Sequence, residues 1–132
     1  MPVIRLISFG YLHLKGGPPP AADRVEDVRN RLRDPAAAQD VLDLDGRDPR
    51  VQDIVLNTPG ARELLDNLTA YACLPASPQA LATGCAGGKH RAVAISEILG
   101  RELRERGFDV VIEHRHVDLP RVFPAPFARR QP

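Results

Sequence analysis

Apolar residues alternate between two spacings along the chain. Residues 3–9, Val-Ile-Arg-Leu-Ile-Ser-Phe, are mostly β-branched or large and apolar and end at Gly10, which predicts a largely buried strand. Residues 24–28 and 79–83 are shorter strand candidates, and residues 109–114, Asp-Val-Val-Ile-Glu-His, form the last predicted strand. Helical segments are predicted between these runs.

Helix start and stop signals place the helices. Asp48-Pro49 has the pattern of an N-cap followed by proline at the first helical position, and Thr58-Pro59 repeats it. Apolar residues at helical spacing also fill residues 90–106, with Gly107 as the expected C-cap. This order predicts an α/β fold: one domain with a small mixed or parallel sheet flanked by helices in two or three layers, with at least one right-handed βαβ crossover.

Length and turn residues set the domain boundaries. A chain of 132 residues holds one domain, which we assign to residues 1–118. Residues 119–132 form a proline-rich, basic tail that we do not expect to pack deeply. Residues 14–22 contain three consecutive prolines and are predicted to be a loop, and no structure is assigned to residues 29–48.

Charge and cysteine content narrow the classes of function. The net charge of +1 comes from 18 basic and 17 acidic residues, so anion binding must be local rather than a property of the whole surface. The chain shows neither a membrane-length apolar run nor a signal peptide, which predicts a cytoplasmic protein without a membrane partner. Cys73 and Cys85 do not form a disulfide framework, and Cys73 is expected to pack in the core.

A glycine-rich segment between the third strand and the third helix carries the candidate chemistry. It reads Gly84-Cys85-Ala86-Gly87-Gly88-Lys89-His90-Arg91 and is called the 84–91 loop below. A strand, a glycine-rich turn and a helix in succession gather free backbone N–H groups at the positive end of the helix dipole. Lysine and arginine add donors suited to a doubly charged phosphate, so the loop predicts a phosphorylated ligand.

The same loop admits an enzymatic alternative. Its lysine is followed by histidine, so it is not a Walker P-loop, but Cys85 and Arg91 have the Cys-x5-Arg spacing of cysteine-dependent phosphatases. There, a thiolate attacks phosphorus while the arginine holds the oxygens. Gly84 and Ala92 stand where such enzymes carry a histidine and a hydroxyl residue, and we therefore rank this alternative below binding without turnover.

The 84–91 loop, together with Ser8-Phe9-Gly10, the Asp27-Val28-Arg29 segment, the Asp45-Gly46-Arg47-Asp48 turn and His114-Arg115, resembles the C-terminal domain of the RapZ family. Members of this family are RNase adapters, also described as nucleotide-binding proteins, with a kinase-like N-terminal domain. The resemblance implies a regulatory domain that senses a sugar phosphate or nucleotide and forms homo-oligomers. Ala86 and Ala92 replace a threonine and a serine of the family pattern, and each replacement removes a hydroxyl from the loop.

The remaining expectations concern partners. We expect no cofactor and no metal, since His114-x-His116 is a weak metal signal without a third ligand. RNA is a second candidate partner, although the tail's arginines are dispersed, and a separate kinase-like protein is a third. The residues expected to contact the phosphorylated ligand are His13, Asp27, Gly84, Cys85, Ala86, Gly87, Gly88, Lys89, His90, Arg91 and Arg115.

Overall fold

The structure is a computed structural model that describes residues 3–32, 41, 43–76 and 78–120. Residues 121–132, most of the predicted tail, lie outside the described residues, as does most of the segment 29–48 that was left unassigned.

A four-stranded parallel sheet forms the centre of the domain. Its strands are β1 (Val3–Gly10), β2 (Arg24–Asp27), β3 (Ala80–Cys85) and β4 (Asp109–His114), in the order β2-β3-β1-β4. Every neighbouring pair is parallel. The α/β prediction is therefore confirmed, and the sheet is parallel rather than mixed.

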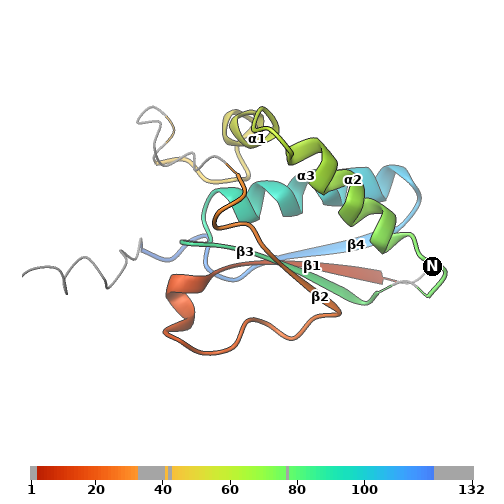
Figure 1. Cartoon of the computed structure of the whole chain (residues 1–132), viewed down its shortest axis with the longest axis horizontal. Helices are drawn as coiled ribbons and strands as arrows, with labels where there is room; N and C mark the ends of the chain where they lie inside the picture. The colour runs from red at the N-terminus through yellow and green to blue at the C-terminus, as the bar shows by residue number, and fades with distance from the viewer. Residues whose placement is uncertain (1–2, 33–40, 42, 77, 121–132) are drawn as a thin grey trace, which may run out of the picture.

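The helices cover one face of the sheet. They are α1 (Pro49–Leu56), α2 (Ala61–Ala72) and α3 (Arg91–Glu105), and Figure 1 shows all three above the strands. The crossovers from β2 to β3 and from β3 to β4 move in the same direction across the sheet. Because crossovers between parallel strands have one handedness, α1, α2 and α3 lie on the same face. The connection from β1 to β2 moves the opposite way and runs below the sheet (Figure 1).

Two apolar clusters fill the domain, one on each face. Alternate β1 residues Ile4 and Leu6 face the helices and pack in the larger cluster with Leu99 and Leu103 of α3. The other β1 residues, Ile7 and Phe9, pack in the smaller cluster with residues of β3 and β2 and are covered by half-buried residues of the β1 to β2 connection. The further members are Ala80 and Ala82 of β3, Val25 of β2, and Tyr11, Leu14 and Ala22 of the connection. Within the described residues the architecture is two-layered, and a short segment replaces a second helical layer.

The helix boundaries follow the predicted signals at α1 and depart from them at α2. The Asp48 side chain accepts the N–H of Arg50 as the predicted N-cap of α1. The predicted start of α2 at Thr58-Pro59 is wrong: its N-cap is Gly60, at φ 89°, and the helix begins at Ala61. Thr58 instead donates its hydroxyl to the carbonyl of Ile54, so it ends α1 rather than starting α2.

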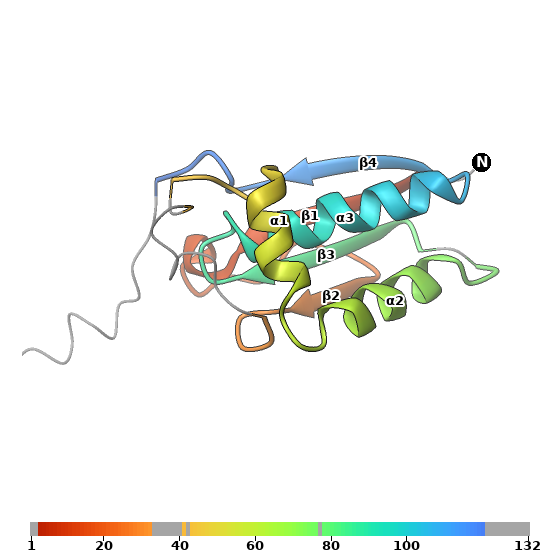
Figure 2. The same cartoon turned by 90° about the horizontal axis from the view of Figure 1, so that it is seen from above.

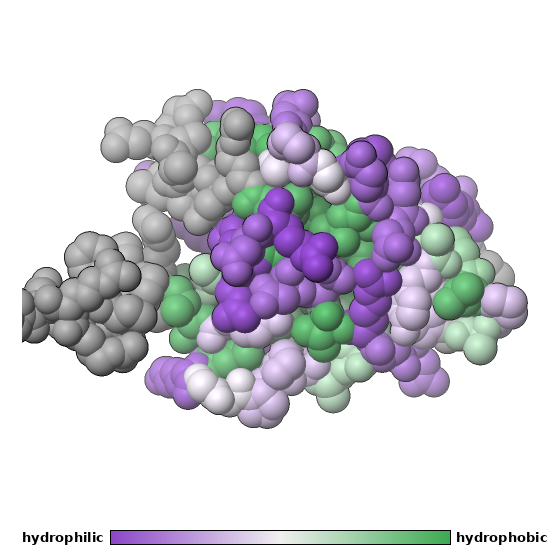
Figure 3. Space-filling view, in the orientation of Figure 1, coloured by the Kyte–Doolittle hydropathy of each residue, from purple (hydrophilic) through white to green (hydrophobic). Residues whose placement is uncertain are grey.

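Charged side chains protect the β2 edge of the sheet. Figure 2 shows β2 at one side of the sheet and β4 at the other, and Figure 3 shows hydrophilic residues gathered in the middle of the face on the β2 side. Arg24 pairs with Glu26 on this edge and also bonds Asn67 of α2. Charge on an edge strand discourages pairing with another sheet. Among the described helices, none is long and apolar enough to cross a membrane.

Candidate functional site

The 84–91 loop lies at the carboxyl end of the sheet. Gly84 and Cys85 are the last residues of β3, Arg91 is the first of α3, and the intervening residues make the turn. In a parallel sheet the strand ends on either side of such a turn form the usual ligand-binding edge. Here those neighbours are the ends of β1 and β2, since Gly10 pairs in register with Cys85 and Asp27 with Gly84.

Backbone packs directly on backbone between β1 and the loop. A Cβ atom on Gly10 would lie 2.4 Å from the carbonyl carbon of Gly87 and 2.6 Å from the nitrogen of Gly88. Gly88 itself has a φ of 71°, which disfavours any side chain. The glycines therefore bring the turn against the end of β1 as closely as main chains allow.

Hydrogen bonds fix the course of the loop. The Ala86 carbonyl accepts the N–H of Leu12 at 3.0 Å, and the Lys89 carbonyl accepts the N–H of Gly46 at 2.9 Å. Inside the turn, Gly88 donates its N–H to Cys85 Sγ at 3.2 Å. These contacts tie the turn to the segment after β1 and to the segment before α1, so hydrogen bonds within the chain define its shape.

Arg91 is buried beneath the loop and holds another segment in place. Its Nη1 donates to the carbonyl of Arg29 at 2.6 Å and lies 3.4 Å from the carbonyls of Val28 and Leu32. The residue is 5% exposed. Arg91 was predicted to bind the ligand. In this structure its Nη1 donates instead to the backbone that follows β2.

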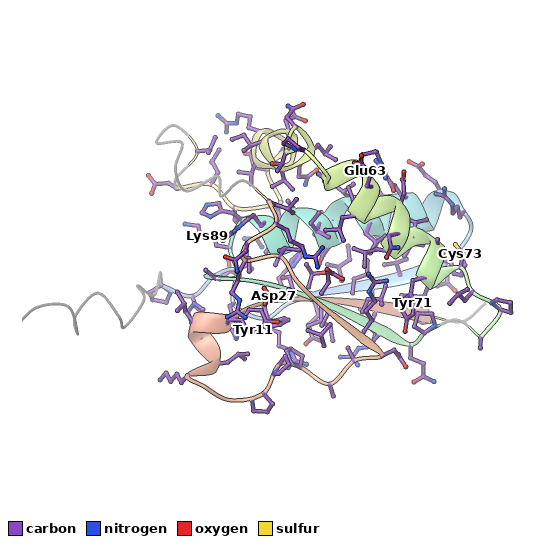
Figure 4. All side chains as sticks on the ribbon, viewed as in Figure 1. Tyr11, Asp27, Glu63, Tyr71, Cys73 and Lys89 are labelled. Atoms are coloured by element: carbon purple, nitrogen blue, oxygen red, sulfur yellow. The ribbon has the colours of Figure 1, made fainter. Side chains whose placement is uncertain are left out.

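Asp27, predicted as a ligand contact, belongs to a charged and aromatic cluster at the end of β2. Its carboxylate pairs with Arg29, which holds the pKa of Asp27 below its usual range. The Arg29 guanidinium lies 3.6 Å from the centre of the Tyr11 ring. Figure 4 shows Asp27, Tyr11 and Lys89 at the same end of the domain. The stacked Arg29 thus borders the loop on the β2 side.

His13 and His116 lie on the other side of the loop. The two rings stack with centroids 4.7 Å apart, His13 from the 3₁₀ helix η1 (Tyr11–Leu14) and His116 from the segment after β4. His116 Nδ1 accepts the N–H of Gly10 at 2.8 Å. Arg115, the third predicted contact outside the loop, directs its Nε to Glu113 instead.

A partly buried chain of polar contacts runs beneath this edge. Ser8 Oγ lies 2.6 Å from His114 Nδ1, and His114 Nε2 lies 2.7 Å from Glu97 Oε2 on α3. His114 and His116 bond different partners, since His114 lies against Glu97 and His116 accepts the N–H of Gly10. Within the residues that the structure describes, no group of three or more potential metal ligands occurs.

An ion-paired turn closes the site from the helical side. Asp45 pairs with Arg47, which also pairs with Asp118 after β4. A Cβ on Gly46 would lie 2.3 Å from the backbone nitrogen of Ala94, so this turn packs tightly on the first turn of α3.

The structure therefore divides the predicted contacts. It brings His13, Asp27 and the turn 86–90 to one edge, whereas Arg91 Nη1 and Arg115 Nε are directed to protein groups. Reasoning from the sequence missed Tyr11, Arg29 and His116. Tyr11 adjoins one quoted segment and Arg29 ends another, so both were within reach of that reasoning. The contact of His116 with Gly10 spans 106 positions and has no local signal. Cys73, expected in the core, is exposed, and Figure 4 shows it at the opposite end of the domain.

Comparison with known proteins identifies relatives of this chain. The family model of the RapZ C-terminal domain matches residues 2–118. The chain is 42% identical over 118 residues to a nucleotide-binding protein of Frankia casuarinae, with 83% of this chain and 39% of that protein covered. The values are the same for a nucleotide-binding protein of Thermobifida fusca. One from Alkaliphilus oremlandii is 36% identical over 125 residues, with 89% and 42% covered.

The chain thus spans about two fifths of the length of these relatives. The family model matches nearly all of the described residues, and the fold and the 84–91 loop agree with this match. The chain therefore belongs to the RapZ C-terminal domain family.

Proposed function

We propose that this domain is a regulatory binding module that holds a phosphorylated small molecule, a sugar phosphate or a nucleotide, on the turn 86–90. Binding, without turnover, is its function. The relatives of this chain are named nucleotide-binding proteins, which supports a phosphorylated ligand.

The observation that carries the proposal is the preformed turn at the start of α3. The carbonyls of residues 86 and 89 accept hydrogen bonds from other segments, which hold the turn in place. The first turn of α3 follows directly and begins at the carboxyl edge of the sheet. Backbone N–H groups there attract anions, and the half-buried Lys89 adds a full positive charge. A phosphate seated at this point would have His13 on one side and Arg29 on the other.

The phosphatase alternative is the weaker one on this geometry. A cysteine phosphatase needs its arginine to clamp the phosphoryl oxygens during attack. Arg91 Nη1 is 2.6 Å from the Arg29 carbonyl, so the arginine would have to leave this bond in order to act on a substrate. Cys85 is also buried, at 2% exposure, which hinders in-line attack.

Ligand-dependent unfolding tests the proposal. Thermal unfolding of the wild-type protein should be measured with inorganic phosphate, hexose 6-phosphates, nucleoside monophosphates and an unphosphorylated hexose. A ligand at one hundred times its Kd stabilises the folded state by about 2.7 kcal/mol. We expect a phosphorylated compound to raise the Tm while the free hexose leaves it unchanged.

The two lysines of the chain provide a matched pair of variants. Lys89→Gln removes the charge in the turn, and Lys15→Gln removes the same charge from an exposed position. Lys89→Gln should weaken binding at least tenfold and Lys15→Gln should not. If neither variant changes the affinity, or if no phosphorylated compound shifts the wild-type Tm, the proposal is wrong. A steep fall of RNA affinity with added salt would then favour the RNA-binding alternative.

A further inference from the structure

We propose that His116 is a positioning residue for the anion site: its unprotonated Nδ1 holds the end of β1 against the glycine turn, and its protonation releases that contact. The inference rests on the proposed function, because it concerns regulation of the same site.

The first step is the bond between His116 and Gly10. Nδ1 accepts the Gly10 N–H at 2.8 Å, so the proton of the neutral ring resides on Nε2. A second proton would have to enter at Nδ1, where the amide hydrogen already points. The bond and the charged imidazole therefore exclude each other.

The second step links Gly10 to the turn. The backbone of Gly10 packs so closely on Gly87 and Gly88 that no Cβ fits between them. If the Gly10 N–H loses its acceptor, the β1 terminus loses a restraint at the point where it supports the turn. A preformed anion site then becomes a looser one, and its affinity falls with the fraction of molecules in the binding conformation.

The surroundings of His116 oppose its protonation. Burial lowers the pKa of His116, and the positive potential of His13 and Arg115 lowers it further. The turn beyond Gly10 carries the basic residues Lys89 and His90.

The acidic neighbours do not offset this effect. Asp118, two positions on, is paired with Arg47, and Glu97 bonds His114 rather than His116. The site is thereby kept in its ordered state near neutral pH and becomes sensitive to acidification.

Two variants separate positioning from simple electrostatics. His116→Asn places an amide oxygen near the position of Nδ1, so it keeps an acceptor for Gly10 and cannot titrate. His116→Ala has no acceptor at any pH. The probe is inorganic sulfate, whose charge does not change between pH 5.5 and 7.5, measured by calorimetry with each protein.

We expect the sulfate affinity of His116→Asn relative to wild type to rise at least threefold from pH 7.5 to 5.5. His116→Ala should bind more weakly than wild type at pH 7.5. A ratio that is constant or falls with acidification overturns the inference, as does a His116→Ala protein with wild-type affinity.

A ligand-free measurement distinguishes this inference from the proposed function. The amide signals of Gly10, Gly87 and Gly88 in nitrogen-15 NMR spectra should titrate together in wild type and stay constant in His116→Asn. Identical pH curves in the two proteins overturn the positioning role, even if sulfate binds well. Absence of sulfate binding with the expected amide titration overturns the proposed function and leaves the contact between His116 and Gly10 established.

Discussion

Arg91 donates its Nη1 to the backbone carbonyl of Arg29 at 2.6 Å, across 62 positions of the chain. Arg91→Ala would leave this carbonyl and its neighbours without their charged donor, which costs about 2–3 kcal/mol of the free energy of unfolding. Arg106→Ala, at the exposed end of the same helix, should change it by less than about 0.5 kcal/mol. Urea unfolding measures the free energy of unfolding of both variants. Equal values would show that Arg91 does not stabilise the fold.

A second prediction concerns the close approach of β1 and the turn. Gly10→Ala introduces a Cβ 2.4 Å from the Gly87 backbone, and neither main chain can yield without moving the strand end. We expect a loss of about 2 kcal/mol or more in stability, together with loss of phosphate binding. Gly87→Ala is the matched control because its Cβ would meet no atom within 4 Å. Similar Tm values for the two variants would contradict the described packing.

The strands and α3 could be predicted because their signals are local. The strand predicted at residues 109–114 coincides with β4. Gly107, predicted as the C-cap of α3, follows the actual C-cap Arg106 and has a positive φ of 91°. The start of α2 could not be placed because Thr58-Pro59 carries the same signal as Asp48-Pro49. Only the structure shows that the Thr58 hydroxyl bonds backward to Ile54.

The backbone of the candidate site could be predicted from the sequence, but the contacts of its side chains could not. Gly84 to Arg91 marks a strand, a turn and a helix, and that arrangement is present. The Arg91 side chain points to the carbonyls of Arg29 and Leu32, which lie in a segment for which the sequence predicts no structure. The contacts of Ser8 with His114 and of Gly10 with His116 depend on the parallel register of β1 and β4, which joins positions 106 residues apart.

Acid should loosen the turn that packs on α3. The hydrogen bond from Arg47 holds the pKa of Asp45 below its usual range. A carboxylate with a depressed folded-state pKa stabilises the fold above its unfolded pKa of about 3.9, and this contribution disappears as the pH falls through the lower folded value. Because Arg47 is half exposed, we expect at most about 1 kcal/mol.

Thermal unfolding of wild type and Asp45→Asn between pH 2.5 and 6 measures this contribution. The difference between the two proteins should be largest at pH 6 and shrink below pH 4. Asp66→Asn removes a carboxylate from the exposed pair with Arg62 and serves as the control. A stability difference for Asp45→Asn that does not change with pH would show that its cause is not this ionisation.

The last prediction concerns the polar chain beneath the sheet edge. Ser8 is fully buried, and its hydroxyl lies 2.6 Å from His114 Nδ1. His114→Ala would remove the hydrogen-bond partner of this hydroxyl and of Glu97. The free energy of unfolding of the variant should therefore fall by about 1–3 kcal/mol. Once His114 is absent, the further change Ser8→Ala should cost little, because an unpaired buried hydroxyl is itself unfavourable.

A double-mutant cycle measures this coupling. We expect an interaction energy of about 1–2 kcal/mol between Ser8→Ala and His114→Ala in urea unfolding. Ser8→Ala combined with Arg62→Ala should be additive within about 0.5 kcal/mol, since Arg62 bonds Asp66 and Glu102 and shares no partner with Ser8. Additivity of the Ser8 and His114 variants would mean that the short contact contributes nothing to the fold. Coupling of the expected size would mean that the contact between Ser8 and His114 helps to hold β1 against β4, and with it Gly10 beside the proposed anion site.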